Sequence, residues 1–198
     1  MKLIVVASPV PLPMEQQLIS QLFEHGLETL HLRKPGFSLE EMRKFIAETP
    51  AQYHSRLMLH SHHELAQEFE VKGLHFPEAI RASAATTPKD RLLFSTSFHQ
   101  LQNVLKPQPL FDYVFLSPIF DSISKEGYQA AFAPEDLQRT VRQAKVPLVA
   151  LGGVNLSSLE AVQKMGFAGA AVLGAVWQAE EPVKTFLELQ RLVNDSEA

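Results

Sequence analysis

Two short apolar runs near the end of the chain, each closed by glycine, restrict its fold more than any other feature. The first covers residues 146–151 and is followed by Gly152 and Gly153, and the second covers 169–173 and is followed by Gly174. Five of the nine glycines lie between positions 152 and 174. Glycine lets a backbone approach an anion closely, and N–H groups at a helix N-terminus point toward one. This pattern is typical of the last two strands of a parallel α/β barrel that hold a phosphate group.

Apolar runs of this kind alternate with helical patterns along the whole chain. The predicted strands cover residues 3–7, 28–33, 56–60, 73–76, 92–97, 112–117, 147–151 and 169–173. The predicted helices cover residues 14–23, 64–69, 99–105, 155–165 and 182–193, with two more after the capping box at 38–41 and from Pro134. We therefore predict a (β/α)8 TIM barrel that forms one domain over residues 1–198. The competing fold is an open doubly wound sheet, which carries its glycine-rich loop after the first strand, where this chain has Ser8-Pro9-Val10-Pro11.

Composition excludes several classes of function. The formal charge of −4 gives no basic footprint for nucleic acid. The absence of cysteine removes disulfides, thiolate metal sites and a cysteine nucleophile. The first residues are interrupted by Pro9, Pro11 and Pro13 too early for a signal peptide, and no apolar run approaches the ~20 residues of a membrane span. We expect a cytoplasmic protein with neither nucleic acid nor a membrane as partner.

In a barrel of this type the functional residues lie at the carboxyl ends of the strands. Nearly every predicted strand stops in a polar residue or glycine, with basic and hydroxyl groups dominating, which favours an anion-binding rim. The plain alternative is that strands end where polar loops begin. The rim candidates are His31, Arg33, His60, His75, Ser97, Ser117, Gly152, Gly153, Leu173 and Gly174.

Strand alternation sharpens the prediction for the second strand. His31 and Arg33 are two residues apart, so both side chains point to the same side, and we expect Arg33 to face the barrel mouth. A guanidinium at a water-poor site needs an anionic partner. That partner is either a ligand or a rim carboxylate, for which Glu78 and Asp121 are the candidates.

The loop after the sixth strand is the second predicted site. It brings together Ser122, Ser124 and Lys125, whose hydroxyls and ammonium suit a pyrophosphate, and Gly127 is a candidate hinge. The alternative is a solvated loop that happens to contain serines.

Histidines suggest a metal site only weakly. His62 and His63 begin a predicted helix and should point apart, so we do not expect them to join His60 as ligands. His99 opens another predicted helix, where capping or surface exposure is expected. Trp177 is interpreted as a core or subunit-contact residue.

From residue 3 to about 189 the chain resembles the thiamine phosphate synthase / TenI family of β/α barrels. The most specific pieces are Asp112-Tyr-Val-Phe-Leu-Ser-Pro-Ile-Phe120 with Ser122-Ile-Ser-Lys125, and Val149-Ala-Leu-Gly-Gly-Val154. Three further pieces are Leu30-His-Leu-Arg33, Ser97-Phe-His99 and Gly166-Phe-Ala-Gly-Ala-Ala-Val-Leu173.

The resemblance implies a transferase that couples hydroxymethylpyrimidine pyrophosphate to hydroxyethylthiazole phosphate and releases pyrophosphate. Such chemistry needs positive charge on the leaving pyrophosphate and a fixed nucleophile. By resemblance, Arg33, Ser97 and Lys125 hold the pyrophosphate, and Ser122 and Ser124 line the thiazole side. The backbones of Gly152, Gly153, Leu173 and Gly174 bind the thiazole phosphate, while His31 and Ser117 complete the substrate-binding set and His60 joins the catalytic set.

The chain departs from this family at its magnesium site. Two aspartates that bind Mg²⁺ in the synthases are replaced by Ser61 and Ile80, and the family's Arg-x-Lys becomes Arg33-Lys34-Pro35. Hard cations depend on carboxylates, so Mg²⁺ becomes a doubtful cofactor, with Glu64 or Glu78 as substitute ligands.

Some TenI members are instead thiazole tautomerases, with a histidine where this chain has Pro118. An isomerase acting on thiazole phosphate is therefore the alternative function, with a base drawn from His31, His60 or His75. A non-catalytic barrel that binds thiazole or thiamine phosphate is the third hypothesis. A homodimer is a hypothesis that the sequence does not test.

Overall fold

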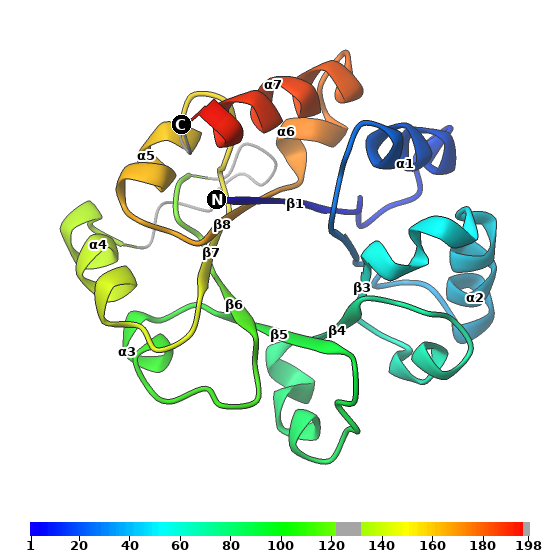
Figure 1. Ribbon diagram of the computed structural model, residues 1–198, viewed down its shortest axis with the longest axis horizontal. Coiled ribbons are helices and arrows are strands. Elements are labelled where there is room, and N and C mark those ends of the chain that lie inside the picture. Colours follow the sequence, from blue (N-terminus) through cyan, green and yellow to red (C-terminus); the bar gives the residue numbers. More distant parts are fainter. Residues whose placement is uncertain (122–131, 196–198) are drawn as a thin grey trace.

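The computed structural model describes residues 1–121 and 132–195 and shows a closed barrel of parallel strands (Figure 1). Strand order follows the sequence, and β8 pairs with β1 through Lys2↔Gly169 to close the ring. The predicted (β/α)8 barrel is confirmed, and the open sheet is excluded. The strands are β1 Lys2–Val6, β2 Leu30–Leu32, β3 Leu57–Leu59, β4 Gly73–Phe76, β5 Leu93–Phe98, β6 Tyr113–Leu116, β7 Leu148–Leu151 and β8 Gly169–Val172.

Helices cover the outside of the barrel, as Figure 1 shows. The α-helices are α1 Glu15–Glu24, α2 Leu39–Glu48, α3 Leu101–Val104, α4 Pro134–Gln143, α5 Leu159–Lys164, α6 Gly174–Trp177 and α7 Pro182–Asp195. Three segments are 3₁₀ helices, namely η1 Ala51–Arg56, η2 His63–Gln67 and η3 Glu78–Ala85. The helix predicted over 64–69 is thus a 3₁₀ turn, and α3 is shorter than the predicted 99–105.

Local sequence signals account for several helix ends. Ser38 and Glu41 form the predicted capping box at the start of α2, and Pro134 occupies the first turn of α4. Helix α5 begins later than predicted, because the Asn155 side chain accepts hydrogen bonds from the amides of Ser157 and Ser158 and holds a turn there.

The inside of the barrel is apolar on one side and polar on the other. The side formed by β1 and β6–β8 carries a buried cluster of Ile4, Val6, Phe115, Val149 and Ala171. The side formed by β2, β4 and β5 buries polar groups instead, because His31, His75 and Ser95 are between 0% and 2% exposed. Buried polar groups require hydrogen-bond partners, so this side of the barrel must contain an internal polar network.

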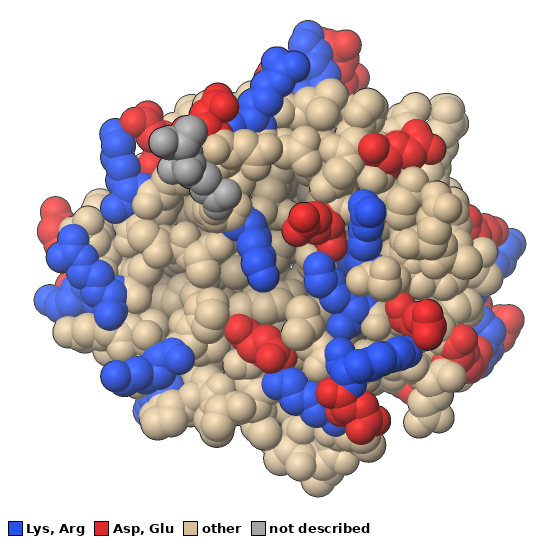
Figure 2. Space-filling model, viewed as in Figure 1, with Lys and Arg blue, Asp and Glu red and all other residues tan. Residues whose placement is uncertain are grey.

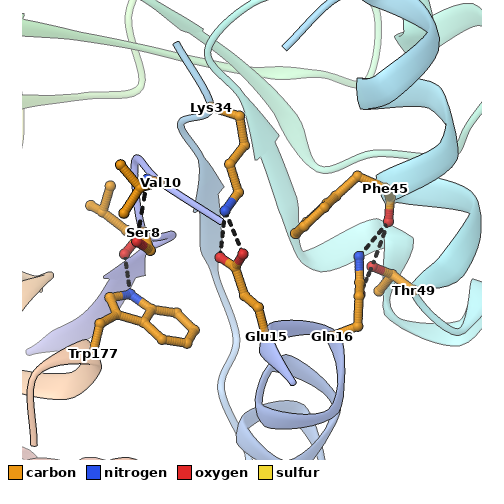
Figure 3. A network of polar contacts seen from close by, with 9 residues as sticks. Ser8, Val10, Glu15, Gln16, Lys34, Phe45, Thr49 and Trp177 are labelled. Carbon is orange, nitrogen blue, oxygen red and sulfur yellow. Dashed lines mark hydrogen bonds and ion pairs between the residues drawn. The ribbon is translucent and has the colours of Figure 1, made fainter. Parts of the chain in front are cut away.

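Lys34, the residue after Arg33, lies on the helix side of β2 and not in the barrel (Figure 3). Its Nζ pairs with the carboxylate of Glu15 at the start of α1, and both side chains are buried. The rings of Phe37 and Phe45 lie within 6 Å of the ammonium. Lys34 is therefore a structural residue. It does not take the place of the lysine in the Arg-x-Lys motif that the resemblance implied.

Among the described residues, no helix is long and apolar enough to cross a membrane. On the face seen in Figure 2, lysine and arginine side chains alternate with aspartate and glutamate, without a continuous basic area.

Candidate functional site

A cavity of about 590 Å³ opens at the carboxyl ends of the strands. Its volume lies within the usual range for small-molecule sites. Residues from both halves of the chain line it. The rim residues predicted from the sequence that line this cavity are Arg33, His60, His75, Ser97, Ser117, Gly152, Gly153, Leu173 and Gly174.

The ends of β7 and β8 form one wall of this cavity with their backbones. Gly152 and Gly153 have φ values of +92° and +69°, a left-handed conformation that favours glycine. The amide of Gly153 has no hydrogen-bond acceptor among the described residues, and Gly174 begins α6, so its N–H has no acceptor within the helix. These amides are available to an anionic group in the cavity.

The two glycines are also needed for packing, which the sequence did not predict. A Cβ at Gly153 would lie 2.4 Å from the carbonyl oxygen of Asp121, and one at Gly152 would lie 2.9 Å from the Cα of Pro118. The segment after β6 therefore packs directly on the backbone after β7, with no room for a side chain between them.

Arg33 supplies the cation of the site. Its side chain is exposed to the cavity, and among the residues that the structure describes it forms no ion pair with Glu78 or any other carboxylate. The predicted alternative, a salt bridge from Arg33 to Glu78, is therefore not formed in the described structure. An unpaired guanidinium that lines a cavity is suited to an anionic ligand.

Three histidines from neighbouring strands cluster at the cavity, two in its lining and one beneath them. His31, His60 and His75 bring ring nitrogens within 4.8 Å of one another. The rings of His60 and His75 stack with their centroids 4.0 Å apart. His31 is fully buried beneath the other two and does not line the cavity, so it reaches a ligand only through its neighbours. Alternation placed His31 on the correct side of β2, but not at its depth.

Three imidazoles can in principle hold a metal ion, but here their nitrogens are largely engaged. His31 Nδ1 lies 2.8 Å from His60 Nε2, and His31 Nε2 lies 2.6 Å from the hydroxyl of Tyr113. His75 Nδ1 and Nε2 lie 2.9 and 3.1 Å from the hydroxyls of Ser95 and Ser97. The cluster is therefore a hydrogen-bonded network, and no metal is needed to explain its order.

The environment keeps these imidazoles neutral. Burial lowers the pKa of His75 to about 3, and the charges of His63, Arg33 and Arg81 act in the same direction. Burial also places the pKa values of His31 and His60 well below the usual 6.5, with a further lowering from His75. A neutral imidazole accepts a hydrogen bond at one ring nitrogen and donates a hydrogen bond from the other.

His62 and His63 bond to different partners and do not join the three histidines as possible ligands, as expected. Their Nε2 atoms pair with the carbonyls of Phe37 and His75, respectively. His99 does not cap α3, because its Nδ1 lies 3.0 Å from the carbonyl oxygen of Ser117 and its ring lines the cavity. His99 is exposed, which is one of the two outcomes expected from the sequence, but its place in the lining of the cavity was not predicted.

Two other predictions about the site concern carboxylates and the loop after β6. Glu78 is the one carboxylate among the described residues that line the cavity, while Ser61 and Ile80 do not line it.

Trp177 packs on the core, lines the cavity, and donates from Nε1 to the carbonyl of Val6 at 2.7 Å. The predicted ligands Ser122, Ser124 and Lys125, with the hinge Gly127, lie outside the described residues.

Fold and site together define a single-domain (β/α)8 barrel whose strand ends surround one small-molecule cavity. Residues 4–176 match the family model described as thiamine monophosphate synthase, and the chain belongs to this family. The family is named for a step of thiamine biosynthesis.

Relatives and solved structures agree with this assignment. The thiamine-phosphate synthase of Latilactobacillus sakei is 30% identical over 174 residues, which cover 82% of this chain and 78% of the relative. That of Archaeoglobus fulgidus is 24% identical, covering 90% and 86%. The crystal structure of thiamine phosphate pyrophosphorylase from Bacteroides thetaiotaomicron superposes with a TM-score of 0.82 at 30% identity and covers 98% of each chain.

Proposed function

We propose that this chain couples hydroxymethylpyrimidine pyrophosphate to hydroxyethylthiazole phosphate, forming thiamine phosphate and releasing pyrophosphate. One observation carries the proposal. Within residues 1–121 and 132–195, one cavity of about 590 Å³ holds both a guanidinium without an ion-pair partner, from Arg33, and backbone amides without a hydrogen-bond acceptor, at Gly153 and Gly174. Each substrate carries a phosphoryl group, so a cavity with two separate anion-binding regions suits the pair.

The residues of the cavity divide between the two substrates. Arg33 follows the end of β2 and Ser97 lies in β5, and both are assigned to the pyrophosphate, with Lys125 as their expected partner. The amides after β7 and β8 are assigned to the thiazole phosphate. Loss of pyrophosphate from the pyrimidine leaves a cation that the thiazole nitrogen captures, so the protein contributes chiefly orientation and charge on the leaving group.

His60 lines the same cavity as a neutral group. Because burial keeps its pKa well below 6.5, it adds no positive charge beside a pyrimidine cation. Its ring can orient the heterocycle through a hydrogen bond. Ser117, which follows β6 and also lines the cavity, is assigned the same positioning role.

Mg²⁺ in proteins is often held by one or two carboxylates together with substrate phosphates. Glu78 is the carboxylate of the described cavity lining that fits this role, and it takes the place of the Asp ligands that the resemblance implied. When bound, the ion would neutralise charge on the leaving pyrophosphate. The assignments to Arg33 and Ser97 do not depend on it.

The coupling assay tests the proposal directly. Thiamine phosphate formation from the two substrates should be measured with Mg²⁺ and with EDTA, for the wild type and for Arg33→Gln. We expect turnover by the wild type and a loss of at least tenfold in kcat/KM for the variant. A wild type that binds both substrates and forms no product above background contradicts the proposal.

A second function, isomerisation of a thiazole phosphate by proton transfer, is favoured by one observation. His60 is a neutral imidazole with a ring nitrogen open to the cavity, which is what a general base requires. The test is tautomerisation of a non-aromatic thiazole phosphate by the wild type and by His60→Asn, and an unchanged rate in the variant would remove His60 from that role. Tight binding of thiazole phosphate without either reaction would indicate a binding protein.

A further inference from the structure

Three imidazoles meet at one place in the barrel, although they lie far apart in the sequence. His31 lies in β2, His60 directly follows β3, and His75 lies in β4. One ring nitrogen from each of the three lies within 4.8 Å of the other two. Because the three strands are hydrogen-bonded neighbours, the barrel wall itself fixes the spacing of these side chains.

The strand register explains why these side chains converge. Met58 of β3 pairs with His31 of β2 and with Gly73 of β4. His60 and His75 each lie two residues further along their chains, so they point to the same side of the sheet and stand level with each other. His31 lies on that side as well, one step lower, which places it beneath the other two rings.

The arrangement of the rings suits a shared metal ion. The rings of His60 and His75 lie at an interplanar angle of 20°, and the ring of His31 stands at 80° and 72° to them. Two nitrogens of a tetrahedral zinc site lie about 3.3 Å apart, because each Zn–N bond is about 2.0–2.1 Å long. His31 Nδ1 and His60 Nε2 lie 2.8 Å apart, so this pair has to open by roughly half an ångström. Their mutual hydrogen bond is the one bond between the ligands that a metal ion has to replace.

The outer hydrogen bonds of the cluster are those of a metal site. A metal-bound histidine almost always donates its second ring N–H to an oxygen, which fixes the tautomer and the ring orientation. The other ring nitrogen of His31, Nε2, lies 2.6 Å from the hydroxyl of Tyr113. His75 has a serine hydroxyl at each ring nitrogen, Ser95 at Nδ1 and Ser97 at Nε2. One of these two bonds therefore remains, whichever nitrogen of His75 binds the ion.

The chemistry of the ligands selects the class of metal. Imidazole nitrogen suits zinc and its first-row neighbours, whereas Mg²⁺ and Ca²⁺ prefer oxygen ligands. Among the described residues, the cluster contains three histidines and no carboxylate. Burial keeps the pKa values of the three imidazoles below the usual 6.5, which agrees with the neutral form that binds metal ions.

The fourth coordination position of such an ion faces the cavity. His60 and His75 line the cavity and His31 is buried beneath them, so the cavity side is the one without a histidine ligand. Three protein ligands and one open position are the pattern of catalytic zinc sites. The charge of Arg33 lowers the pKa of both His60 and His75, so a divalent ion here adds to a positive potential that is already present. That potential favours a small anion as the fourth ligand.

We propose that His31, His60 and His75 form a binding site for one divalent transition-metal ion of the Zn²⁺ type, whose fourth position accepts a small anion from the cavity. The site is separate from the carboxylate Mg²⁺ site assigned to Glu78. It goes beyond the coupling reaction, which does not depend on it. The sequence neighbours His62 and His63 take no part, because neighbouring strands supply the ligands.

Zinc titration of the untagged protein tests the site. We expect one Zn²⁺ per chain by calorimetry, with an affinity that excess Mg²⁺ leaves unchanged. Tyr113→Phe removes only the outer hydrogen bond of His31 and should weaken Zn²⁺ binding by about tenfold. His75→Gln removes a ligand and should weaken it by more than about 100-fold, beyond the range of an outer hydrogen bond. The matched control is His99→Gln, which should keep the wild-type affinity, because His99 lines the same cavity outside the cluster.

His60→Gln is the second ligand variant, should His75→Gln fail to fold, because His60 is the least buried of the three histidines. A wild type that does not bind one Zn²⁺ per chain overturns the proposal. So does an affinity that a folded ligand variant leaves within twofold of the wild type, or a Zn²⁺ ion that Mg²⁺ displaces.

Cobalt substitution tests the geometry of the site. Co²⁺ can take the place of Zn²⁺, and its strong visible absorption is the signature of tetrahedral coordination. We expect this absorption in the wild type, its loss in His75→Gln, and a change in the wild-type spectrum when azide is added as a small anion. Weak absorption of the octahedral type, or a spectrum that azide does not change, contradicts three histidine ligands with one open position. Neither titration involves thiamine phosphate, so a failure of the coupling reaction would leave both readouts intact.

Discussion

The ammonium of Lys34 lies 2.5 and 2.6 Å from the two carboxylate oxygens of Glu15, in a site between β2 and α1 from which water is excluded (Figure 3). Lys34 is 1% exposed and Glu15 is 5% exposed. Lys34 lies past the end of β2, and its ion pair with Glu15 of α1 holds its side chain on the helix side, away from the cavity. Of the two adjacent basic residues, Lys34 is therefore structural, whereas Arg33 lines the cavity and is available to a ligand.

Breaking this pair should destabilise the fold without changing the site. Glu15→Gln leaves a buried ammonium without its counter-ion, which typically costs about 3–5 kcal/mol. We expect a matching loss in the free energy of unfolding, measured by urea denaturation. The double variant Glu15→Leu/Lys34→Met should recover most of the loss, because it removes both charges. A Glu15→Gln variant as stable as the wild type would contradict the buried pairing.

Arg33 should contribute to ligand binding and hardly to stability. Removal of a charge-assisted hydrogen bond costs about 1.5–3 kcal/mol, so Arg33→Gln should weaken pyrophosphate binding by roughly tenfold to 150-fold in a calorimetric titration. The control is Arg139→Gln on α4, whose ion pair with Asp136 is exposed and remote from the cavity. The same expectation holds for Lys125→Ala. Equal affinity in Arg33→Gln and the wild type would exclude Arg33 from the anion site.

The sequence predicted the architecture well because its signals are local. Most strands are short, largely apolar runs that are buried on both faces, and the limits of every strand were predicted within two residues. The Ser38–Glu41 capping box and Pro134 at the first turn of α4 depend on neighbours in the sequence, and both are confirmed. The rim residues could be predicted from the strand limits, because the carboxyl ends of parallel strands lie at one end of the barrel.

The polar network could not be predicted, because it depends on distances between strands. His31, His75 and Tyr113 come from β2, β4 and β6, and no spacing in the sequence shows that they share one layer of the barrel. Alternation gives the side of a strand on which a residue lies, and the strand register gives its depth. His31 was therefore expected at the rim, although the structure places it one layer lower.

Gly153 leads to a different prediction than its sequence context did. The sequence suggested only a phosphate-binding backbone there, but the structure directs a Cβ at this position onto the Asp121 carbonyl at 2.4 Å and holds φ at +69°. Gly153→Ala should therefore lower the melting temperature by several degrees, since a loss of 1 kcal/mol corresponds to about 2–4 °C in a chain of this size. Gly36→Ala is the control, because nothing lies within 4 Å of its added Cβ. Equal melting temperatures for the two variants would contradict the packing at Gly153.

The buried histidines should make stability depend on pH in a defined direction. In the unfolded chain a histidine has a pKa near 6.5, whereas burial lowers the pKa of His75 to about 3 in the folded protein. Above pH 6.5 both states are neutral and the histidine contributes no pH dependence. Below it the unfolded state binds a proton that the folded state does not, so stability falls as pH decreases toward 3.

Each such histidine contributes a slope of about 1.4 kcal/mol per pH unit between these limits. We expect the free energy of unfolding, measured by urea denaturation at pH values from 7 to 4, to fall more steeply in the wild type than in His75→Gln. The difference should approach one histidine's slope below pH 6, and His31→Gln should act in the same way, because burial places the pKa of His31 well below 6.5 as well. Gln102→Ala, an exposed change that removes no titrating group, should keep the wild-type slope. Parallel curves for His75→Gln and the wild type would mean that His75 is charged in the folded protein, which is incompatible with a neutral network beneath the cavity.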